Sequence, residues 1–178
     1  MPAKKAPDKS LDAVTLLEHD HREVKSLFKE FEKATQLESR LDLAQHIGQK
    51  LSVHAQVEEQ KFYPAIKAIP EVADMVAESL EEHRQVKELI AELKGMQPSD
   101  KTFEPKMKVL MEDVEHHVKE EEKEMFPKVR KGLGKEKLSE LGHEMNQLMQ
   151  TAKGGTASGP ERITEPVRDP ARTGKTNA

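Results

Sequence analysis

Apolar residues recur along most of this chain at steps of three and four, the spacing that places them on one face of an α-helix. The stripes are separated by a polar break near residues 35–40 and by Pro- or Gly-containing breaks at 64–70 and 95–102. They run from Val14 to Phe31, from Leu43 to Phe62, from Val72 to Leu93 and from Met107 to Glu121. The pattern therefore predicts four amphipathic helices.

The stripes and the sequence on either side of them divide the chain into three predicted parts. Residues 1–9 are rich in Lys, Ala and Pro and form an expected flexible N-terminus, after which Ser10 is a candidate helix cap. Residues 10–150 form the expected helical domain, with a shorter amphipathic stretch at 135–150 that predicts a fifth helix covering the bundle. Residues 151–178 turn to Gly, Thr, Ser, Pro and scattered charge and are predicted to be a disordered tail.

Four histidines interrupt the apolar stripes, one on each predicted helix, at positions 21, 54, 83 and 117. The second and fourth are each followed four residues later by a glutamate, Glu58 and Glu121. Residues four apart lie about 40° apart around a helix, so each pair presents an imidazole and a carboxylate on one face. This arrangement makes a metal site in the bundle core the first hypothesis.

The chain also repeats itself. The heptapeptide that begins at His21 matches the one that begins at His83, and His54-x3-Glu58-Glu59-x4-Pro64 matches His117-x3-Glu121-Glu122-x4-Pro127, at offsets of 62 and 63 residues. Each half is therefore one helical hairpin, and two hairpins make a four-helix bundle. Each histidine lies about 18–22 Å of helix from its loop, so all four are expected in one inward-facing layer.

A layer of buried imidazoles and carboxylates is costly without partners, and a metal pair supplies them. A metal-free bundle with a buried His–Glu network is the alternative reading. The other histidines lie off the stripes and are expected on the surface; they are His19, His46, His116 and His143. Of the glutamates that follow the metal candidates, Glu59 or Glu122 is a possible outer hydrogen-bond acceptor.

Composition narrows the function further. The net charge is -4, and no basic cluster with interleaved aromatics is present, so we expect no nucleic-acid partner. No apolar run reaches the roughly 18–20 residues that span a bilayer, and no apolar segment follows the first five residues. We therefore expect no membrane partner and a cytoplasmic location. The chain has no cysteine, which excludes disulfides, thiolate metal sites and iron–sulfur clusters.

At this point the residues resemble the hemerythrin-like (HHE cation-binding) family. The order His21, His54-x3-Glu58, His83, His117-x3-Glu121 is similar to that of the family. The local phrases Asp20-His21, Glu58-Glu59 before Phe62-Tyr63-Pro64, Glu82-His83, and Glu121-Glu122 before Met125-Phe126-Pro127 fit too. The resemblance covers residues 10–150 and implies an all-α, up-down-up-down four-helix bundle.

The resemblance also implies a non-haem di-iron centre with an oxo- or hydroxo-type bridge, although manganese or zinc are further possible occupants. Its ligands by position are His21, His54, His83 and His117, with Glu58 and Glu121 as bridges. The oxygen carriers of the family have a fifth histidine where this chain has Lys87, and their second bridging carboxylate falls at Glu122. We prefer Glu121 because it repeats the Glu58 spacing, and we expect Lys87 to leave a coordination position open.

The resemblance finally implies that the iron pair binds or reacts with O2, NO or peroxide, in stress defence or in redox or gas handling. Whether this makes the protein an enzyme is left open. The alternative is a non-enzymatic iron or oxygen sensor or storage protein whose folding depends on metal. A plain helical scaffold is the third hypothesis.

Overall fold

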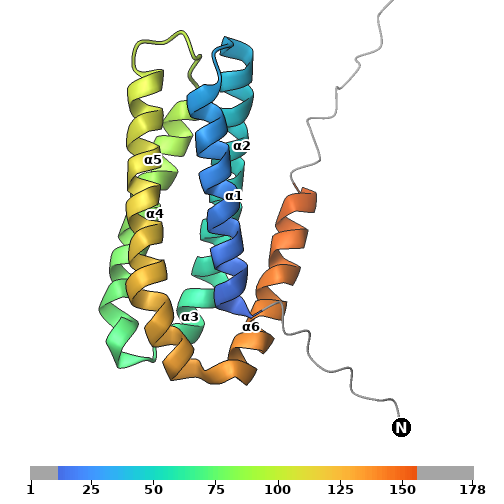
Figure 1. Cartoon of the computed structure of the whole chain (residues 1–178), viewed down its shortest axis with the longest axis vertical. Coiled ribbons are helices and arrows are strands. Elements are labelled where there is room, and N and C mark those ends of the chain that lie inside the picture. The colour runs from blue at the N-terminus through green and yellow to red at the C-terminus, as the bar shows by residue number, and fades with distance from the viewer. Residues whose placement is uncertain (1–11, 156–178) are drawn as a thin grey trace, which may run out of the picture.

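The computed structural model describes residues 12–155, which form a helical bundle without any strand in that range (Figure 1). The elements are α1 (Ala13–Lys33), α2 (Leu37–Val57), η1 (Glu58–Phe62), α3 (Tyr63–Ile66), η2 (Pro70–Val72), α4 (Ala73–Lys94), α5 (Phe103–Glu120), η3 (Glu121–Met125) and α6 (Phe126–Gly155). Four columns run alternately up and down, made by α1, by α2 with α3, by α4, and by α5 with the start of α6. The predicted all-α, up-down-up-down four-helix bundle is confirmed.

The apolar stripes explain why these segments are helical. The inward stripe positions of α1 are all buried, and so are those of α5; they are Val14, Leu17, His21, Val24, Phe28 and Phe31 in α1, and Met107, Leu110, Val114 and His117 in α5. The first turn of α1 is capped by Asp12, whose carboxylate accepts a hydrogen bond from the backbone N–H of Thr15 at 3.1 Å. The predicted cap Ser10 lies outside the described residues. The stripe from Val72 to Leu93 was expected to include Leu80, but this is wrong, since Leu80 is 44% exposed. The inward place in α4 is taken by Ser79, four residues before His83.

Two of the columns contain a π-helical turn that the sequence analysis did not predict. Segment η1 begins at Glu58 and η3 begins at Glu121. At their ends the backbone N–H of Tyr63 donates to the carbonyl of Glu58, and that of Phe126 donates to the carbonyl of Glu121. Each π turn thus brings the residue five positions after a glutamate back under it, whereas in an α-helix that residue would lie about 140° away.

The structure also corrects the break predicted at 64–70, which begins later than expected. Pro64 and Pro127 follow the π turns directly, and the helical columns continue past both of them. Each proline is the second residue of the α-helical segment that comes next, directly after the turn in which the backbone hydrogen bonds span five residues instead of four. The chain turns only after Ile66 in the first hairpin column.

The fifth helix is the second part of α6. Gly134 has φ +76°, a left-handed conformation that glycine adopts without strain, and the helix changes direction there. The following residues fold back beside α1 and α2 (Figure 1) and bury Leu138, Leu141, Met145 and Met149. The helix continues to Gly155, so residues 151–155 are helical rather than part of the predicted tail. The predictions for 1–9 and for 156–178 fall outside the described residues.

The hydrophobic core is divided in two. One cluster lies toward α6 and contains Leu17, Val57, Phe62 and Tyr63, while the other lies toward the α4–α5 loop and contains Phe28, Phe31, Ile47 and Phe103. Between them each column carries its histidine, and two columns add a glutamate, all buried. The bundle therefore encloses one polar layer between two apolar ones. Among the described residues, no helix is long and apolar enough to cross a membrane.

Candidate metal centre

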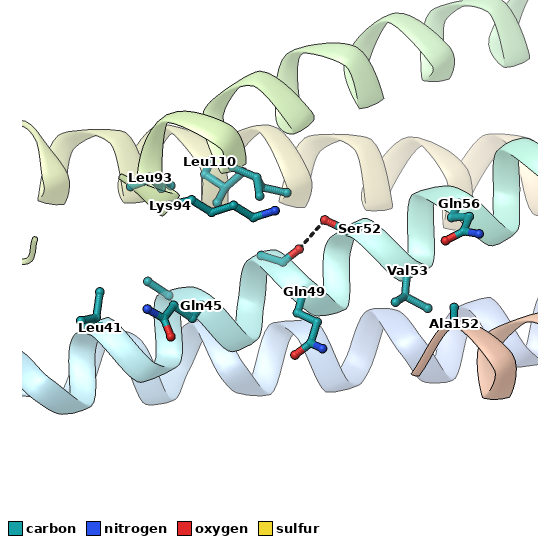
Figure 2. A pocket seen from close by; sticks show the side chains of 13 residues that line it. Leu41, Gln45, Gln49, Ser52, Val53, Gln56, Leu93, Lys94, Leu110 and Ala152 are labelled. Atoms are coloured by element: carbon teal, nitrogen blue, oxygen red, sulfur yellow. Dashed lines mark hydrogen bonds between the residues drawn. The ribbon is translucent and has the colours of Figure 1, made fainter. Parts of the chain in front are cut away.

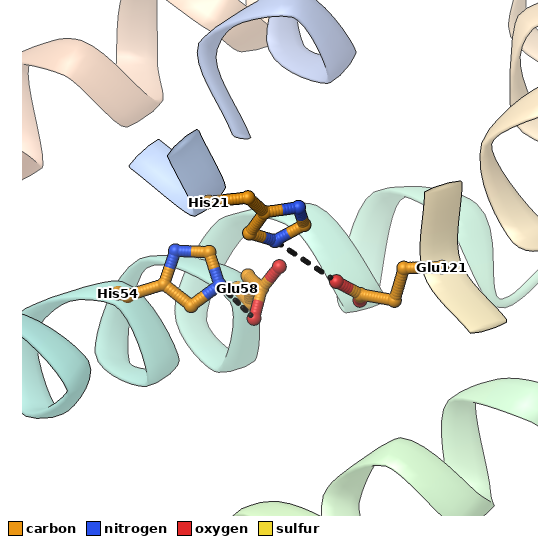
Figure 3. Close-up of side chains that lie close together, drawn as sticks. All are labelled: His21, His54, Glu58 and Glu121. Carbon is orange, nitrogen blue, oxygen red and sulfur yellow. Dashed lines mark ion pairs between the residues drawn. The ribbon is translucent and has the colours of Figure 1, made fainter. Parts of the chain in front are cut away.

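The first part of the polar layer joins α1, α2 and the π turns. His21 Nε2 lies 3.4 Å from Glu121 Oε2, and His54 Nε2 lies 3.2 Å from Glu58 Oε2 (Figure 3). One nitrogen or oxygen of each of these four side chains falls within 4.8 Å of all the others. We call this group the first metal position.

The second part joins α4 and α5 to the same glutamates. His83 Nε2 lies 3.2 Å from His117 Nε2 and 3.2 Å from Glu58 Oε2. Glu121 Oε2 lies 3.5 Å from His117 Nε2, as well as 3.4 Å from His21 Nε2. We call the group of His83, His117 and Glu58 the second metal position. Both glutamates therefore lie between the two positions, which is the arrangement expected of bridging carboxylates.

Each histidine also contacts a carboxylate on its outer side, through Nδ1. The four contacts are His21 with Glu122 at 3.0 Å, His54 with Asp20 at 3.1 Å, His83 with Glu59 at 3.0 Å and His117 with Glu82 at 2.7 Å. These carboxylates, which we call the outer ring, each come from a different column than the histidine they contact. In a neutral imidazole, an Nδ1–H that donates to a carboxylate leaves the lone pair on Nε2, and all four Nε2 atoms face the centre.

The outer ring was only half anticipated. The sequence analysis named Glu59 or Glu122 as a possible acceptor, and both take this place; Asp20 and Glu82 were missed in this role. Their signal was present in the repeat, since each precedes a stripe histidine, but their partners lie on the next column and not on their own. Glu122, with its side chain 30% exposed, lies outside the layer. The structure therefore brings together all six predicted ligands and places Glu121, not Glu122, between the two metal positions.

Three carboxylates of the outer ring each contact a lysine on their outer side. Lys50 Nζ lies 2.9 Å from Asp20, Lys87 Nζ lies 2.6 Å from Glu59, and Lys25 Nζ lies 3.6 Å from Glu122. Lys87, at the place of the fifth histidine of the oxygen carriers, thus reaches an outer carboxylate instead of the centre. No lysine or arginine within residues 12–155 forms an ion pair with Glu82.

The charges of the metal-free layer compensate each other. Burial lowers the pKa of the His21 imidazole, but the carboxylates of Glu121 and Glu122 outweigh it and raise that pKa to about 9. Against the same effect of burial, Glu121 and Glu82 raise the pKa of His117 to about 9. Burial disfavours the charged form of Glu121, yet these two imidazoles hold its pKa well below the ordinary range. Without metal, two protons on imidazoles therefore offset the buried carboxylates.

Four buried atoms of the layer nevertheless have no hydrogen-bond partner. They are His21 Nε2, His54 Nε2, Glu58 Oε1 and Glu121 Oε2, all members of the first metal position. Leaving a buried polar atom unpaired costs about 1–3 kcal/mol, more when the group is charged. The groups do approach one another, with His21 Nε2 3.4 Å from Glu121 Oε2 and His54 Nε2 3.2 Å from Glu58 Oε2, but these contacts lack hydrogen-bond geometry, so a metal-free His–Glu network would satisfy this part of the layer only incompletely. Imidazole nitrogen and carboxylate oxygen are ligands that iron, manganese and zinc accept, so the residues fit a metal pair.

The sequence analysis missed Tyr63 as a member of the layer. Its hydroxyl oxygen lies 3.0 Å from Glu121 Oε1, 3.3 Å from His83 Nε2 and 3.4 Å from Glu58 Oε2, and its side chain is buried. Burial, together with the charges of Glu121 and Glu58, raises the pKa of this phenol well above its ordinary value in the metal-free protein. Helical spacing gave no sign of this contact, because only the π turn brings Tyr63 beneath Glu58.

Two hollows of different kinds lie near the layer. A cavity of about 20 Å³ touches all four histidines and is otherwise lined by apolar side chains, including Val24, Val86 and Val114. A larger hollow of about 490 Å³ runs along the outer face of α2 (Figure 2). Glutamines and Ser52 line it beside Leu93 and Leu110, and the Ser52 hydroxyl donates to the carbonyl of Gly48 at 2.7 Å. The larger of the two hollows is therefore not the one that adjoins the candidate metal ligands.

The remaining histidines lie on the surface, as predicted, at positions 19, 46, 116 and 143. His116 approaches Glu82 and Glu120 closely enough to form a third candidate group, but its side chain is 64% exposed. Water can satisfy exposed polar groups of this kind, so they do not need a metal. None of the unpaired buried atoms that distinguish the central layer belongs to this group.

Comparison with known proteins gives consistent matches. Residues 12–129 match the family described as Hemerythrin HHE cation binding domain. The solved structure of such a domain-containing protein from Mycobacterium kansasii superposes with a TM-score of 0.70 at 27% identity, over 81% of this chain and 88% of that one.

Two curated proteins are also similar to this chain. They are a protein named DNA nickase from Nostoc sp., 27% identical over 143 residues, and an uncharacterised hemerythrin-like protein from Schizosaccharomyces pombe, 27% identical over 119 residues. The matches cover 79% and 66% of this chain, but only 40% and 59% of the length of those two proteins.

Proposed function

The chain belongs to the hemerythrin HHE cation-binding domain family, and on that premise we propose that its polar layer holds two non-haem iron ions that bind or react with O2, NO or peroxide. The observation that carries this proposal is the set of four buried, unpaired nitrogen and oxygen atoms at the first metal position. Together with the second position they offer four imidazoles and two carboxylates to two cations.

The roles of the residues follow from their places. His21 and His54 would hold one ion, and His83 and His117 the other, each through Nε2. Glu58 and Glu121 would join the two ions, because each lies within about 3.5 Å of histidines from both positions. A bound iron pair supplies electron transfer to or from the small molecule. Neutral imidazoles add no charge, so the two carboxylates offset part of the charge of the metals inside the bundle.

The outer ring would orient these ligands. Asp20, Glu59, Glu82 and Glu122 fix the imidazole rings by accepting from Nδ1, which also makes Nε2 a better donor to a metal. Because each outer carboxylate is on a different column from its histidine, the contacts also tie the four columns together at this level. The ring therefore prepares the metal positions before any metal arrives.

The small cavity beside the layer sets the size of the reactant. A volume of about 20 Å³ is close to that of a single water-sized probe, roughly 10–15 Å³. Its walls are apolar side chains and the four histidines, so a molecule of two or a few atoms fits better than an organic substrate. This supports O2, NO or peroxide over a larger substrate.

A second candidate function is a metal-dependent sensor or store of iron or oxygen. It is favoured by the same unpaired atoms, since their cost makes the stability of the bundle depend on metal. Stopped-flow mixing of the iron-loaded protein with peroxide or NO separates the two candidates. Turnover on each addition supports the reactive centre, whereas binding without turnover supports the sensor or store.

The proposal is tested first by metal analysis. We expect close to two irons per chain after anaerobic reconstitution with ferrous iron, and near-UV bands of an oxo-bridged pair after exposure to air. Manganese and zinc added in competition would show how far the nitrogen and oxygen ligands discriminate, which we expect to be weakly. An iron content below one per chain would contradict the proposal.

A further inference from the structure

The two metal positions are built from the same repeat but are not surrounded by the same side chains. Tyr63 and Phe126 occupy equivalent positions of the repeat, and so do Leu17 and Ser79. They are separated by 63 and 62 residues, the same offsets that relate the candidate ligands. The ring of Phe126 stacks on His21, 5.8 Å between centroids, and the ring of Tyr63 lies against His83 at 5.5 Å. The second position therefore has two hydroxyl groups where the first has only carbon.

The contacts of the Tyr63 hydroxyl are difficult to satisfy without a cation. Its three neighbours at 3.0–3.4 Å are a carboxylate oxygen of Glu121, a carboxylate oxygen of Glu58 and His83 Nε2. All three are acceptors when the His83 proton is on Nδ1, where it is donated to Glu59. A phenol has one proton and can donate to only one of these acceptors. Without a cation, the lone pairs of the phenol oxygen would therefore face those of the other two acceptors.

A metal among these four atoms removes the conflict. Ligands about 2.1 Å from an octahedral ion lie about 3.0 Å from their neighbours. The distances from the Tyr63 oxygen to its three neighbours are close to this value, and so is the 3.2 Å between His83 Nε2 and Glu58 Oε2. The phenol oxygen is thus as far from its neighbours as one ligand of an octahedral ion is from the next.

We propose that the Tyr63 oxygen is a ligand of the metal held by His83 and His117, so that the first metal position is the one that keeps a place for the small molecule. This inference rests on the proposed function. The bond between the phenol oxygen and the metal forms as the O–H bond breaks, and the proton leaves to solvent without any change of oxidation state. Lys87 was expected to leave a coordination position open. On this assignment, the Tyr63 oxygen fills that position.

Ser79 supports a metal-bound phenolate. Its buried side chain hydrogen-bonds to the Tyr63 hydroxyl and favours the ionised form of the phenol. A bound cation acts in the same direction and far more strongly, because a coordinating group near a metal loses its proton at a much lower pH than in water. The first position has Leu17 in place of Ser79, and so lacks this support as well.

The test uses the ferric, iron-loaded full chain and exploits the fact that Tyr63 is its only tyrosine. We expect a visible phenolate-to-ferric charge-transfer band equivalent to one phenolate per chain. Resonance Raman excitation in this band should show phenolate ring modes that shift when the protein is produced with ring-deuterated tyrosine. Because this measurement is made on the wild-type chain, it does not depend on whether a variant folds.

Two substitutions sharpen the assignment. Tyr63→Phe should abolish the visible band while retaining two irons and the near-UV bands of the bridged pair. Ser79→Ala should keep the band but move it to longer wavelength, because a phenolate without its hydrogen bond gives up electron density more easily. Two bound irons in a wild-type protein that shows no phenolate modes would overturn this inference and leave the proposed function standing. An iron content below one would overturn the proposed function and the inference with it.

Discussion

The first and second metal positions carry the same ligands on equivalent turns of two hairpins, yet their surroundings differ. His21 and His54 face the centre beside an apolar ring, Phe126, whereas His83 and His117 face it beside a phenol, Tyr63. A repeated sequence thus reproduces the candidate metal ligands more closely than the groups that surround them. The difference predicts two metals with unequal reactivity in one symmetric frame.

The outer charges differ between the halves in the same way. In the first half Lys50, four residues before His54, forms an ion pair with Asp20. The equivalent position in the second half is Asp113, four residues before His117, and burial with the nearby charges of Glu112 and Glu82 raises its pKa. The outer carboxylate Glu82 is therefore less compensated than Asp20.

The largest effect is expected from removing a shared glutamate. Glu58→Ala takes a ligand from both metal positions, so iron content should fall from about two to less than one per chain. Glu122→Ala, which removes an outer contact of His21 and an ion pair with Lys25, should retain both ions with weaker binding. Metal analysis after reconstitution checks both variants. If Glu122→Ala lost the bridged spectrum and Glu121→Ala kept it, the assignment of the bridge would move by one residue.

The next effect is the dependence of the metal-free protein on pH. His21 and His117 have folded-state pKa values raised to about 9, above an unfolded value of about 6.5. Their protonation therefore stabilises the fold fully below about pH 6.5, and this stabilisation, on the order of a few kcal/mol, is lost as the pH rises through 9. The melting temperature of the chelated protein should fall over that range.

Iron-loaded protein gives the matching control. Metal and protons compete for the same imidazole nitrogens, so iron affinity should increase as the pH rises toward 9. At every pH the loaded protein should melt well above the chelated one. Identical melting temperatures after confirmed removal of the metal would show that the unpaired atoms of the layer do not influence stability.

The outer ring offers a smaller, paired comparison. Asp20→Asn and Glu82→Gln each remove the carboxylate from an Nδ1 contact, and each should weaken metal binding about 10–100-fold. Asp20→Asn should also lower stability more, because Lys50 is left without that partner with its side chain only 11% exposed. Iron affinity and denaturant unfolding measure the two effects. Equal losses of stability would mean that the ion pair with Glu23, which Lys50 also forms, is a sufficient partner for the lysine in the variant.

Making the two positions alike tests the comparison directly. Phe126→Tyr introduces at the first position the hydroxyl that the second already has. If the repeat places it equivalently, azide binding to the ferric protein should weaken several-fold and phenolate absorption should increase. The matched control is Phe62→Tyr, on a ring that contacts Phe126 but lies in the apolar cluster. Unchanged azide affinity in Phe126→Tyr would place the open position elsewhere.

The smallest effect is expected at the surface. His116→Ala removes an imidazole next to His117 in sequence but 64% exposed, so iron content should be unchanged and stability should shift by less than about 0.5 kcal/mol. A loss of iron in this variant would show that the exposed group of Glu82, His116 and Glu120 contributes to the centre.

Much of the frame and of the inner ligand set could be predicted from the sequence. A periodicity of 3.6 fixes which residues share a face of one helix, so His21 and Glu121 could be placed inward before any fold was known. The repeat then required four columns with their histidines at one level. The same reasoning failed at Leu80, where the apolar residue faces solvent and Ser79 faces the core, because spacing alone does not fix the rotation of a helix within the bundle.

What the sequence determined by itself was the number of columns and the six side chains that meet between them, since these depend only on positions along single helices. The tertiary structure decided the rest. The outer ring joins residues on neighbouring columns, up to 101 positions apart, and depends on how the columns are rotated against each other. The contact of Tyr63 with the layer depends on a π turn, which moves the fifth residue after Glu58 onto the face that an α-helix would give to the fourth.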